Sequence, residues 1–139
     1  MKYFTIEELT HTNTGLENDP DLSQQLNLRV LVENILDPVR LLLGKPIKVN
    51  SGFRSPDVNH AVGGVSSSLH LKGMAADITS SDNRMLFYLI FEDFKFTQLI
   101  WEKGDDENPE WVHVSYDPDN LKCEALKFNG HFYTKYNSK

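Results

Sequence analysis

The stretch Ser68-Leu69-His70-Leu71-Lys72-Gly73-Met74-Ala75-Ala76-Asp77-Ile78 sets a histidine and an aspartate on either side of small residues. Small side chains let the backbone pass close to another group, and residues 75–78 are expected to form a strand. A neutral imidazole nitrogen and a carboxylate oxygen are both good zinc ligands. Two residues do not make a metal site, however. A buried His70 beside an Asp77 that caps a turn explains this stretch equally well.

A second histidine lies in Trp111-Val112-His113-Val114-Ser115. Its alternating pattern predicts a short strand with His113 on one face and the two valines on the other. A buried histidine needs a polar partner, so a hydrogen-bonded core histidine is the alternative to a ligand. Two histidines and one carboxylate would leave a fourth zinc position for water, as in catalytic rather than structural sites. The sequence therefore favours a catalytic zinc site at His70, Asp77 and His113.

Helices are expected mainly in the first part of the chain. Thr5 is expected to cap a single helical turn. Apolar residues then recur at helical spacing from Leu28 to Leu42, with Pro38 expected to kink or divide the helix. A short helix is expected over residues 57–62, and another after a cap at Ser80 or Ser81.

Strands are expected mainly later, at residues 47–49, 75–78, 98–101 and 111–116. Residues 125–128 and 131–134 flank Asn129-Gly130, which predicts a two-residue hairpin. The prediction is one α+β domain over residues 1–139, with N-terminal helices packed on a small antiparallel sheet.

Composition narrows the class of protein. The hydrophobic fraction of 40% and the charged fraction of 24% are typical of a soluble globular domain. The net charge of −6 argues against a nucleic-acid partner and gives no support for attachment to a membrane. No stretch approaches the ~20 apolar residues of a membrane span, and the N-terminus lacks a signal-peptide pattern. Cys123 has no second cysteine to pair with. We therefore expect a monomer that is cytoplasmic on synthesis.

The combined motifs resemble the M15 family of metallopeptidases, the zinc D-Ala-D-Ala carboxypeptidase group, roughly from Phe4 to Tyr116. The resemblance is closest to short single-domain members from phages and prophages. It implies a Hedgehog/DD-peptidase-like fold, a Zn²⁺ cofactor, peptidoglycan stem peptides as substrates, and release to the wall through phage lysis or another delivery route. The residues that carry it are Ser51-Gly52-Phe53-Arg54-Ser55-Pro56, Asn59, Gly63-Gly64, Ser68, His70, Gly73, Ala75-Ala76-Asp77-Ile78 and Trp111-Val112-His113-Val114-Ser115.

The same resemblance implies His70, Asp77 and His113 as metal ligands and Glu110 as the catalytic carboxylate. Glu110 would take a proton from the zinc-activated water and pass it to the leaving amine. On a regular strand it would face away from His113, so it needs a bulge or a loop to reach the metal. The neighbouring acidic residues that remain alternatives for this role are Glu102, Asp106 and Glu107.

Arg54 and Ser68 also match family positions. Arg54 would bind the substrate carbonyl or carboxylate and offset charge in the tetrahedral intermediate. Ser68 would bind the substrate peptide or orient the ligand loop. The alternative for Arg54 is a surface residue that braces a turn.

The function expected from the resemblance is zinc-dependent hydrolysis of a stem-peptide bond, by a D-Ala-D-Ala carboxypeptidase or an L-Ala-D-Glu type endopeptidase. The short loop before Glu110 favours an open cleft and an endopeptidase. The alternatives are a zinc-binding recognition domain without activity and a structural, virion-associated domain.

Overall fold

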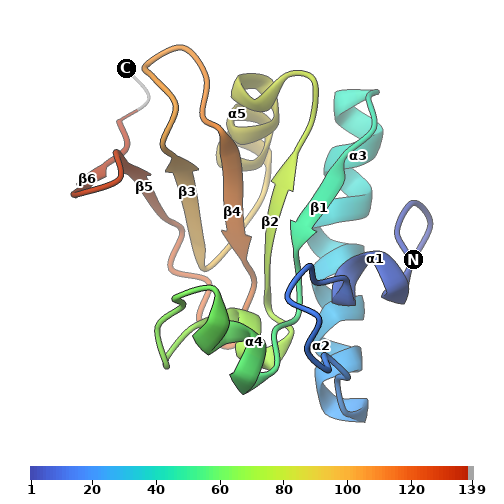
Figure 1. The fold of residues 1–139 in the computed structure, drawn as a ribbon. Helices are drawn as coiled ribbons and strands as arrows, with labels where there is room; N and C mark the ends of the chain where they lie inside the picture. Colours follow the sequence, from blue (N-terminus) through green and yellow to red (C-terminus); the bar gives the residue numbers. More distant parts are fainter. Residues whose placement is uncertain (138–139) are drawn as a thin grey trace.

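A mixed sheet of six strands organises the protein, in the order β1-β2-β4-β3-β5-β6 (Figure 1). The structure is a computed structural model and describes residues 1–137. The expected α+β class is confirmed. The sheet is not wholly antiparallel, however, because β3 and β5 pair in parallel. The strands are β1 Lys48–Ser51, β2 Ala75–Thr79, β3 Gln98–Glu102, β4 Trp111–Ser115, β5 Glu124–Phe128 and β6 Tyr133–Lys135.

The N-terminal helices begin and end where local chemistry requires it. In α1 (Ile6–Thr10), Thr5 and Glu8 form a capping box, as the sequence led us to expect of Thr5. The long apolar stripe forms α2 (Leu22–Leu31), the π-helical segment η1 (Val32–Leu36) and α3 (Asp37–Leu43). Pro38 has no N–H to donate to the residue four positions earlier, so the helix is divided near it, as expected.

Three shorter elements complete the helical part: α4 (Pro56–Ala61), the 3₁₀ turn η2 (Leu69–Lys72) and α5 (Asn83–Asp93). The expected cap of α5 was wrong. Asp82, rather than Ser80 or Ser81, accepts a hydrogen bond from the backbone N–H of Met85. The Ser80 hydroxyl instead accepts a bond from the N–H of Asp82, so it shapes the turn just before the helix.

The core lies between the helices and one face of the sheet. Ile78 on β2 and both valines of β4 are fully buried there, packed with apolar side chains of α5 and of the α2–η1–α3 segment. Because side chains alternate along a strand, Asp77 and His113 point to the opposite face. There, α4 lies in front of one end of the sheet (Figure 1). No helix within residues 1–137 is long and apolar enough to cross a membrane.

The hairpin after β5 differs from the expected two-residue turn. Phe128 pairs with Tyr133, so four residues connect the two strands. The Asn129 side chain accepts hydrogen bonds from the backbone N–H groups of His131 and Phe132, at 2.8 Å each. This local bonding of an asparagine side chain to the following backbone explains why the loop is longer than the Asn-Gly pair indicated.

Candidate metal centre

Asp77 and His113 are brought together by strand pairing. They are direct partners in the antiparallel ladder of β2 and β4, and their side chains leave the sheet on the same face. The His113 Nδ1 lies 3.0 Å from Asp77 Oδ1. Directly paired residues have neighbouring Cβ atoms, so the register alone places two candidate ligands side by side.

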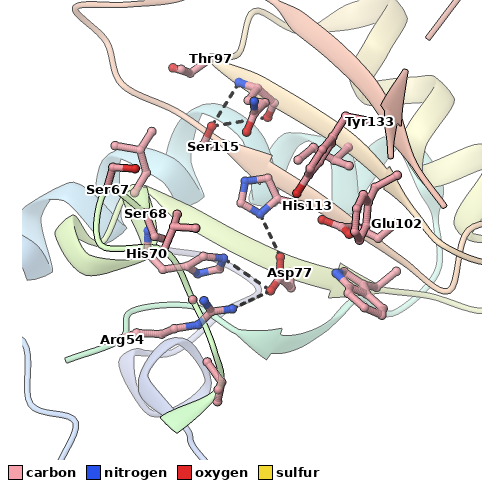
Figure 2. A pocket seen from close by; sticks show the side chains of 18 of the residues that line it. Arg54, Ser67, Ser68, His70, Asp77, Thr97, Glu102, His113, Ser115 and Tyr133 are labelled. Carbon is pink, nitrogen blue, oxygen red and sulfur yellow. Dashed lines mark hydrogen bonds and ion pairs between the residues drawn. The ribbon is translucent and has the colours of Figure 1, made fainter. Parts of the chain in front are cut away.

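His70 reaches the same point from outside the sheet, on the 3₁₀ turn η2 (Figure 2). The Ser68 hydroxyl caps this turn by accepting a hydrogen bond from the backbone N–H of His70. The His70 Nδ1 lies 2.7 Å from the carbonyl oxygen of Gly52, and its Nε2 lies 3.4 Å from Asp77 Oδ2. Since a carbonyl oxygen only accepts, Nδ1 donates to Gly52, and Nε2 is the ring nitrogen that faces Asp77.

These residues fit a zinc ion. One ligand atom from each of His70, Asp77 and His113 can be chosen so that all lie within 4.8 Å of one another. Two imidazole nitrogens and one carboxylate oxygen form a donor set typical of catalytic zinc. The hydrogen bond from His70 to the Gly52 carbonyl is the kind of support that orients metal-binding histidines. The expected Zn²⁺ cofactor therefore agrees with the site.

The electrostatics of the cluster favour ligands in their metal-binding protonation states. Burial lowers the pKa of His70, which favours the neutral imidazole. Burial alone would raise the pKa of Asp77, but hydrogen bonds with His113 and His70 outweigh it and hold that pKa well below its usual range. A metal ion would thus meet a neutral histidine and an ionised aspartate.

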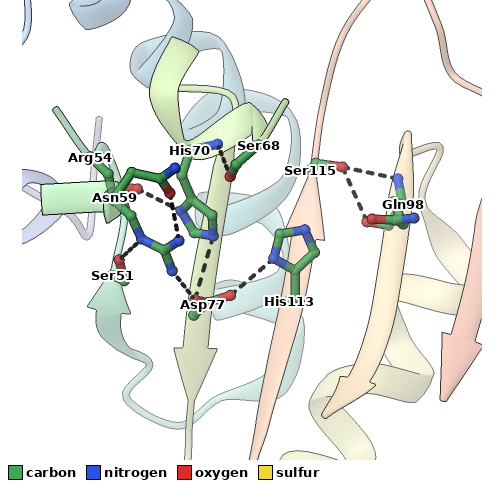
Figure 3. A network of polar contacts seen from close by, with 10 residues as sticks. Ser51, Arg54, Asn59, Ser68, His70, Asp77, Gln98, His113 and Ser115 are labelled. Carbon is green, nitrogen blue, oxygen red and sulfur yellow. Dashed lines mark hydrogen bonds and ion pairs between the residues drawn. The ribbon is translucent and has the colours of Figure 1, made fainter. Parts of the chain in front are cut away.

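Arg54 lies beside the cluster and is bound on three sides (Figure 3). Its guanidinium donates to Ser51 Oγ at 2.9 Å, to Asn59 Oδ1 at 3.2 Å and to Asp77 Oδ2 at 3.1 Å. These bonds hold the Asp77 carboxylate in place. The structure thus shows Arg54 supporting a candidate ligand, while its expected contact with substrate stays a prediction.

A cleft of about 820 Å³ opens over the cluster. Arg54, Ser68 and the 62–65 loop line it. The lining also includes Tyr133 and residues that follow β4, among them Asn120 and Lys122. The cluster therefore lies at the floor of a cleft large enough for a short peptide.

Glu102 and Glu110, which the sequence left as alternatives for the catalytic carboxylate, differ in their position relative to the cleft. Glu102 is partly buried and lines the cleft, whereas Glu110 is exposed and is absent from the cleft wall. The register of β3 and β4 is regular from Gln98 to Glu102, so no bulge turns Glu110 toward His113. The carbonyl of Glu110 accepts a hydrogen bond from Asn83, at the start of α5. Glu110 therefore does not join the cluster in this structure.

Several functional groups escaped the sequence reasoning. The Gly52 carbonyl and the Asn59 side chain support His70 and Arg54, and both come from the Ser51–Asn59 segment that carried the family resemblance. Glu102 was named from the sequence only as one of three alternatives to Glu110. Alternation along Gln98–Glu102 was the further signal for it, because it places that residue on the face opposite the buried Leu99 and Trp101. No sequence pattern predicted that Tyr133 would line the cleft, because only the folded hairpin brings it there.

Comparison with known proteins agrees with this geometry. Residues 2–115 match the family described as Peptidase M15. Over 77 residues the chain is 39% identical to the zinc D-Ala-D-Ala carboxypeptidase of Streptomyces albus G. The matched region is 54% of this chain and 30% of the relative, so the chain corresponds to less than a third of that protein. The family match includes all three residues of the cluster.

Proposed function

We propose, since this chain belongs to the peptidase M15 family of zinc metallopeptidases, that it hydrolyses a peptide bond in peptidoglycan stem peptides. The observation that carries the proposal is the cluster of His70, Asp77 and His113 at the floor of a cleft. The name of the Streptomyces relative, a zinc D-Ala-D-Ala carboxypeptidase, supports stem peptides as the substrate class.

In this proposal, His70, Asp77 and His113 hold the metal. Zinc at such a site polarises the scissile carbonyl and lowers the pKa of a water molecule. Arg54 holds the Asp77 carboxylate in place, and Ser68 holds the turn that presents His70. The substrate chain would lie along the cleft, where Lys103 and Lys122 can meet its carboxylates.

Two activities on the stem peptide are candidates, a D-Ala-D-Ala carboxypeptidase and an L-Ala-D-Glu type endopeptidase. The short loop before Glu110 favours an open cleft, which would suit a chain that continues past the cleaved bond and hence an endopeptidase. A carboxypeptidase would instead release a terminal D-alanine. Action on the wall also requires that the protein leave the cytoplasm, for which release during phage-driven lysis is the proposed route.

Metal analysis and digestion of purified muropeptides test this proposal. The expected result is about one zinc per chain and a new amine or a released amino acid, identified by mass spectrometry. His70→Ala and His113→Ala should each lose both, whereas His11→Ala, an exposed histidine, should lose neither. A zinc-loaded protein that cleaves no stem peptide would instead be a binding domain. A protein without metal would fit a structural role.

A further inference from the structure

Glu102 is the carboxylate that the fold places at the floor of the cleft beside the metal cluster. It ends β3, where it pairs with Trp111 of β4, while Ile100 pairs with His113. Alternation puts Glu102, Ile100, Trp111 and His113 on one face of the sheet. Figure 2 shows Glu102 and His113 extending from adjacent strands into the same cleft, with Tyr133 beside Glu102.

We propose that Glu102, rather than Glu110, is the catalytic carboxylate, and this inference rests on the proposed peptidase function. As the water oxygen forms its bond to the carbonyl carbon, one water proton passes to the Glu102 carboxylate. The C–N bond then breaks, and the same proton moves to the leaving nitrogen. Water and peptide thus become a carboxylic acid and an amine, the second water proton then passes from the new acid to the amine or to solvent, and Glu102 returns to its ionised form.

The surroundings of Glu102 suit this role. Its carboxylate has no hydrogen bond or ion pair with a side chain in residues 1–137, so it is free to accept a proton from a ligand in the cleft. Burial raises its pKa, and the nearby Asp77 adds to this, while His113, Lys103 and Arg54 act in the opposite direction. Partial burial also limits competition from bulk water.

The other acidic residues near this edge of the sheet are engaged elsewhere. Asp106 is paired with Lys127 and Glu107 with Arg84, and neither lines the cleft. Glu110 lies just before the start of β4, where its backbone N–H donates to the Glu102 carbonyl. Glu102 therefore lies in the cleft beside the cluster, whereas Asp106, Glu107 and Glu110 do not line the cleft.

Paired glutamine substitutions test the inference. Glu102→Gln should lower kcat for a stem peptide by a factor of about 100 to 10,000. It should leave KM, the unfolding midpoint and the zinc dissociation constant within about threefold of the parent values, because it removes a proton acceptor and no ligand. Glu92→Gln, an exposed position on α5, is the matched control and should change none of these quantities.

Each of the other outcomes has a distinct meaning. Loss of kcat in Glu110→Gln with retention in Glu102→Gln would overturn the inference and leave the proposed function intact. Loss of zinc from Glu102→Gln would make Glu102 a ligand and overturn it too. A zinc-loaded parent that hydrolyses no stem peptide would overturn both proposals, whereas an active parent with an equally active Glu102→Gln overturns only this one.

Discussion

Asp77 is the residue on which the polar groups of the site converge. Its two carboxylate oxygens contact His113, His70 and Arg54 within 3.0 to 3.4 Å. An ion pair this buried adds little net stability in general, but removal of one partner leaves an uncompensated charge. The arrangement therefore makes sense as a preformed metal site, in which Arg54 keeps the carboxylate in place before and after an ion binds.

The metal-free protein should lose stability as the pH falls through the titration range of His70. Burial lowers the pKa of His70 in the folded state, so the unfolded chain binds the proton more readily. By linkage, the contribution of neutral His70 to stability is fully present above the pKa of histidine in the unfolded chain, about 6.5. It declines as the pH falls below that value. Urea unfolding of chelator-treated protein at about pH 7.5 and pH 5.5 measures this difference.

His70→Gln supplies the comparison, because glutamine does not titrate in this range. The variant should lose less stability between the two pH values than the parent, while the exposed His11→Gln should behave like the parent. Equal pH dependence of stability in all three proteins would show that His70 does not cause it.

Asp77 affects stability at lower pH than His70 does. Its depressed pKa makes its contribution complete above about pH 4 and progressively lost below it.

Gly52 should tolerate no side chain. A Cβ at this position would lie directly against the carbonyl oxygen of Leu9, which accepts a hydrogen bond from the N–H of Phe53. Gly52→Ala should lower the free energy of unfolding by about 1–3 kcal/mol, because the backbone must shift. It should also weaken zinc binding, because the same glycine's carbonyl orients His70.

Chemical unfolding and a zinc competition titration measure the two effects of Gly52→Ala. Gly130→Ala is a suitable control, since Gly130 has a φ of +99° and open space around its Cβ position. That substitution should cost stability through backbone strain and leave zinc affinity unchanged. A Gly52→Ala protein with the parent's zinc affinity would show that the Gly52 carbonyl does not control His70.

At the scale of the element, α5 depends on a cap that the sequence did not single out. Asp82 accepts a hydrogen bond from the N–H of Met85, and α5 carries the buried Leu86, Phe87 and Ile90. Asp82→Ala should therefore lower the free energy of unfolding by about 1 kcal/mol. The exposed Ser81→Ala should change it by less than about 0.5 kcal/mol. Urea denaturation compares them, and a larger cost for Ser81→Ala would reverse the assignment.

Elements with a strong local signal were predictable, and their pairing was not. Pro38 predicted the division of the long helix, strands were predicted where β2 and β3 lie, and alternation predicted β4. The parallel pairing of β3 with β5 has no local signal, because it depends on how the chain returns after Ser115. The hairpin loop was misjudged since Asn129 bonds to the backbone beyond Gly130.

In the candidate site, too, residues with a local sequence signal were predictable, and contacts set by strand pairing were not. His70, Asp77 and His113 were proposed as ligands from residue type and family spacing, and the register of β2 with β4 explains why Asp77 and His113 meet. Sequence spacing suggested Glu110 for the base, although strand parity already counted against it. Glu102 is close to the cluster only through the pairing of β3 with β4, so the fold was needed to place it there.

At the scale of the whole molecule, the segment after the family match completes the cleft. The match ends at residue 115, yet Phe128 and Tyr133 line the cleft. They lie on β5 and β6, which extend the sheet beyond β3. The family region thus supplies the metal cluster, while this C-terminal segment supplies a wall that we expect to influence which stem-peptide bond enters.

Tyr136 secures that wall to the domain. Its ring makes edge contacts with Phe87 at 4.7 Å and Phe91 at 5.0 Å between centroids, and stacks on Trp101 at 6.2 Å. Its backbone N–H donates to the carbonyl of Ala125 on β5. The side chain therefore joins the end of the described chain to the core beneath α5 and β3.

Tyr136→Ala should lower the free energy of unfolding by about 2 kcal/mol, since it removes a partly buried ring with three aromatic partners. It should also raise KM for a stem peptide, because the strands that carry Tyr133 lose their anchor, while zinc affinity stays within about threefold of the parent value. Tyr136→Phe keeps the ring and should match the parent in unfolding, kinetics and metal titration. A Tyr136→Ala protein that is less stable but has an unchanged KM would show that the C-terminal segment closes the sheet without shaping the cleft.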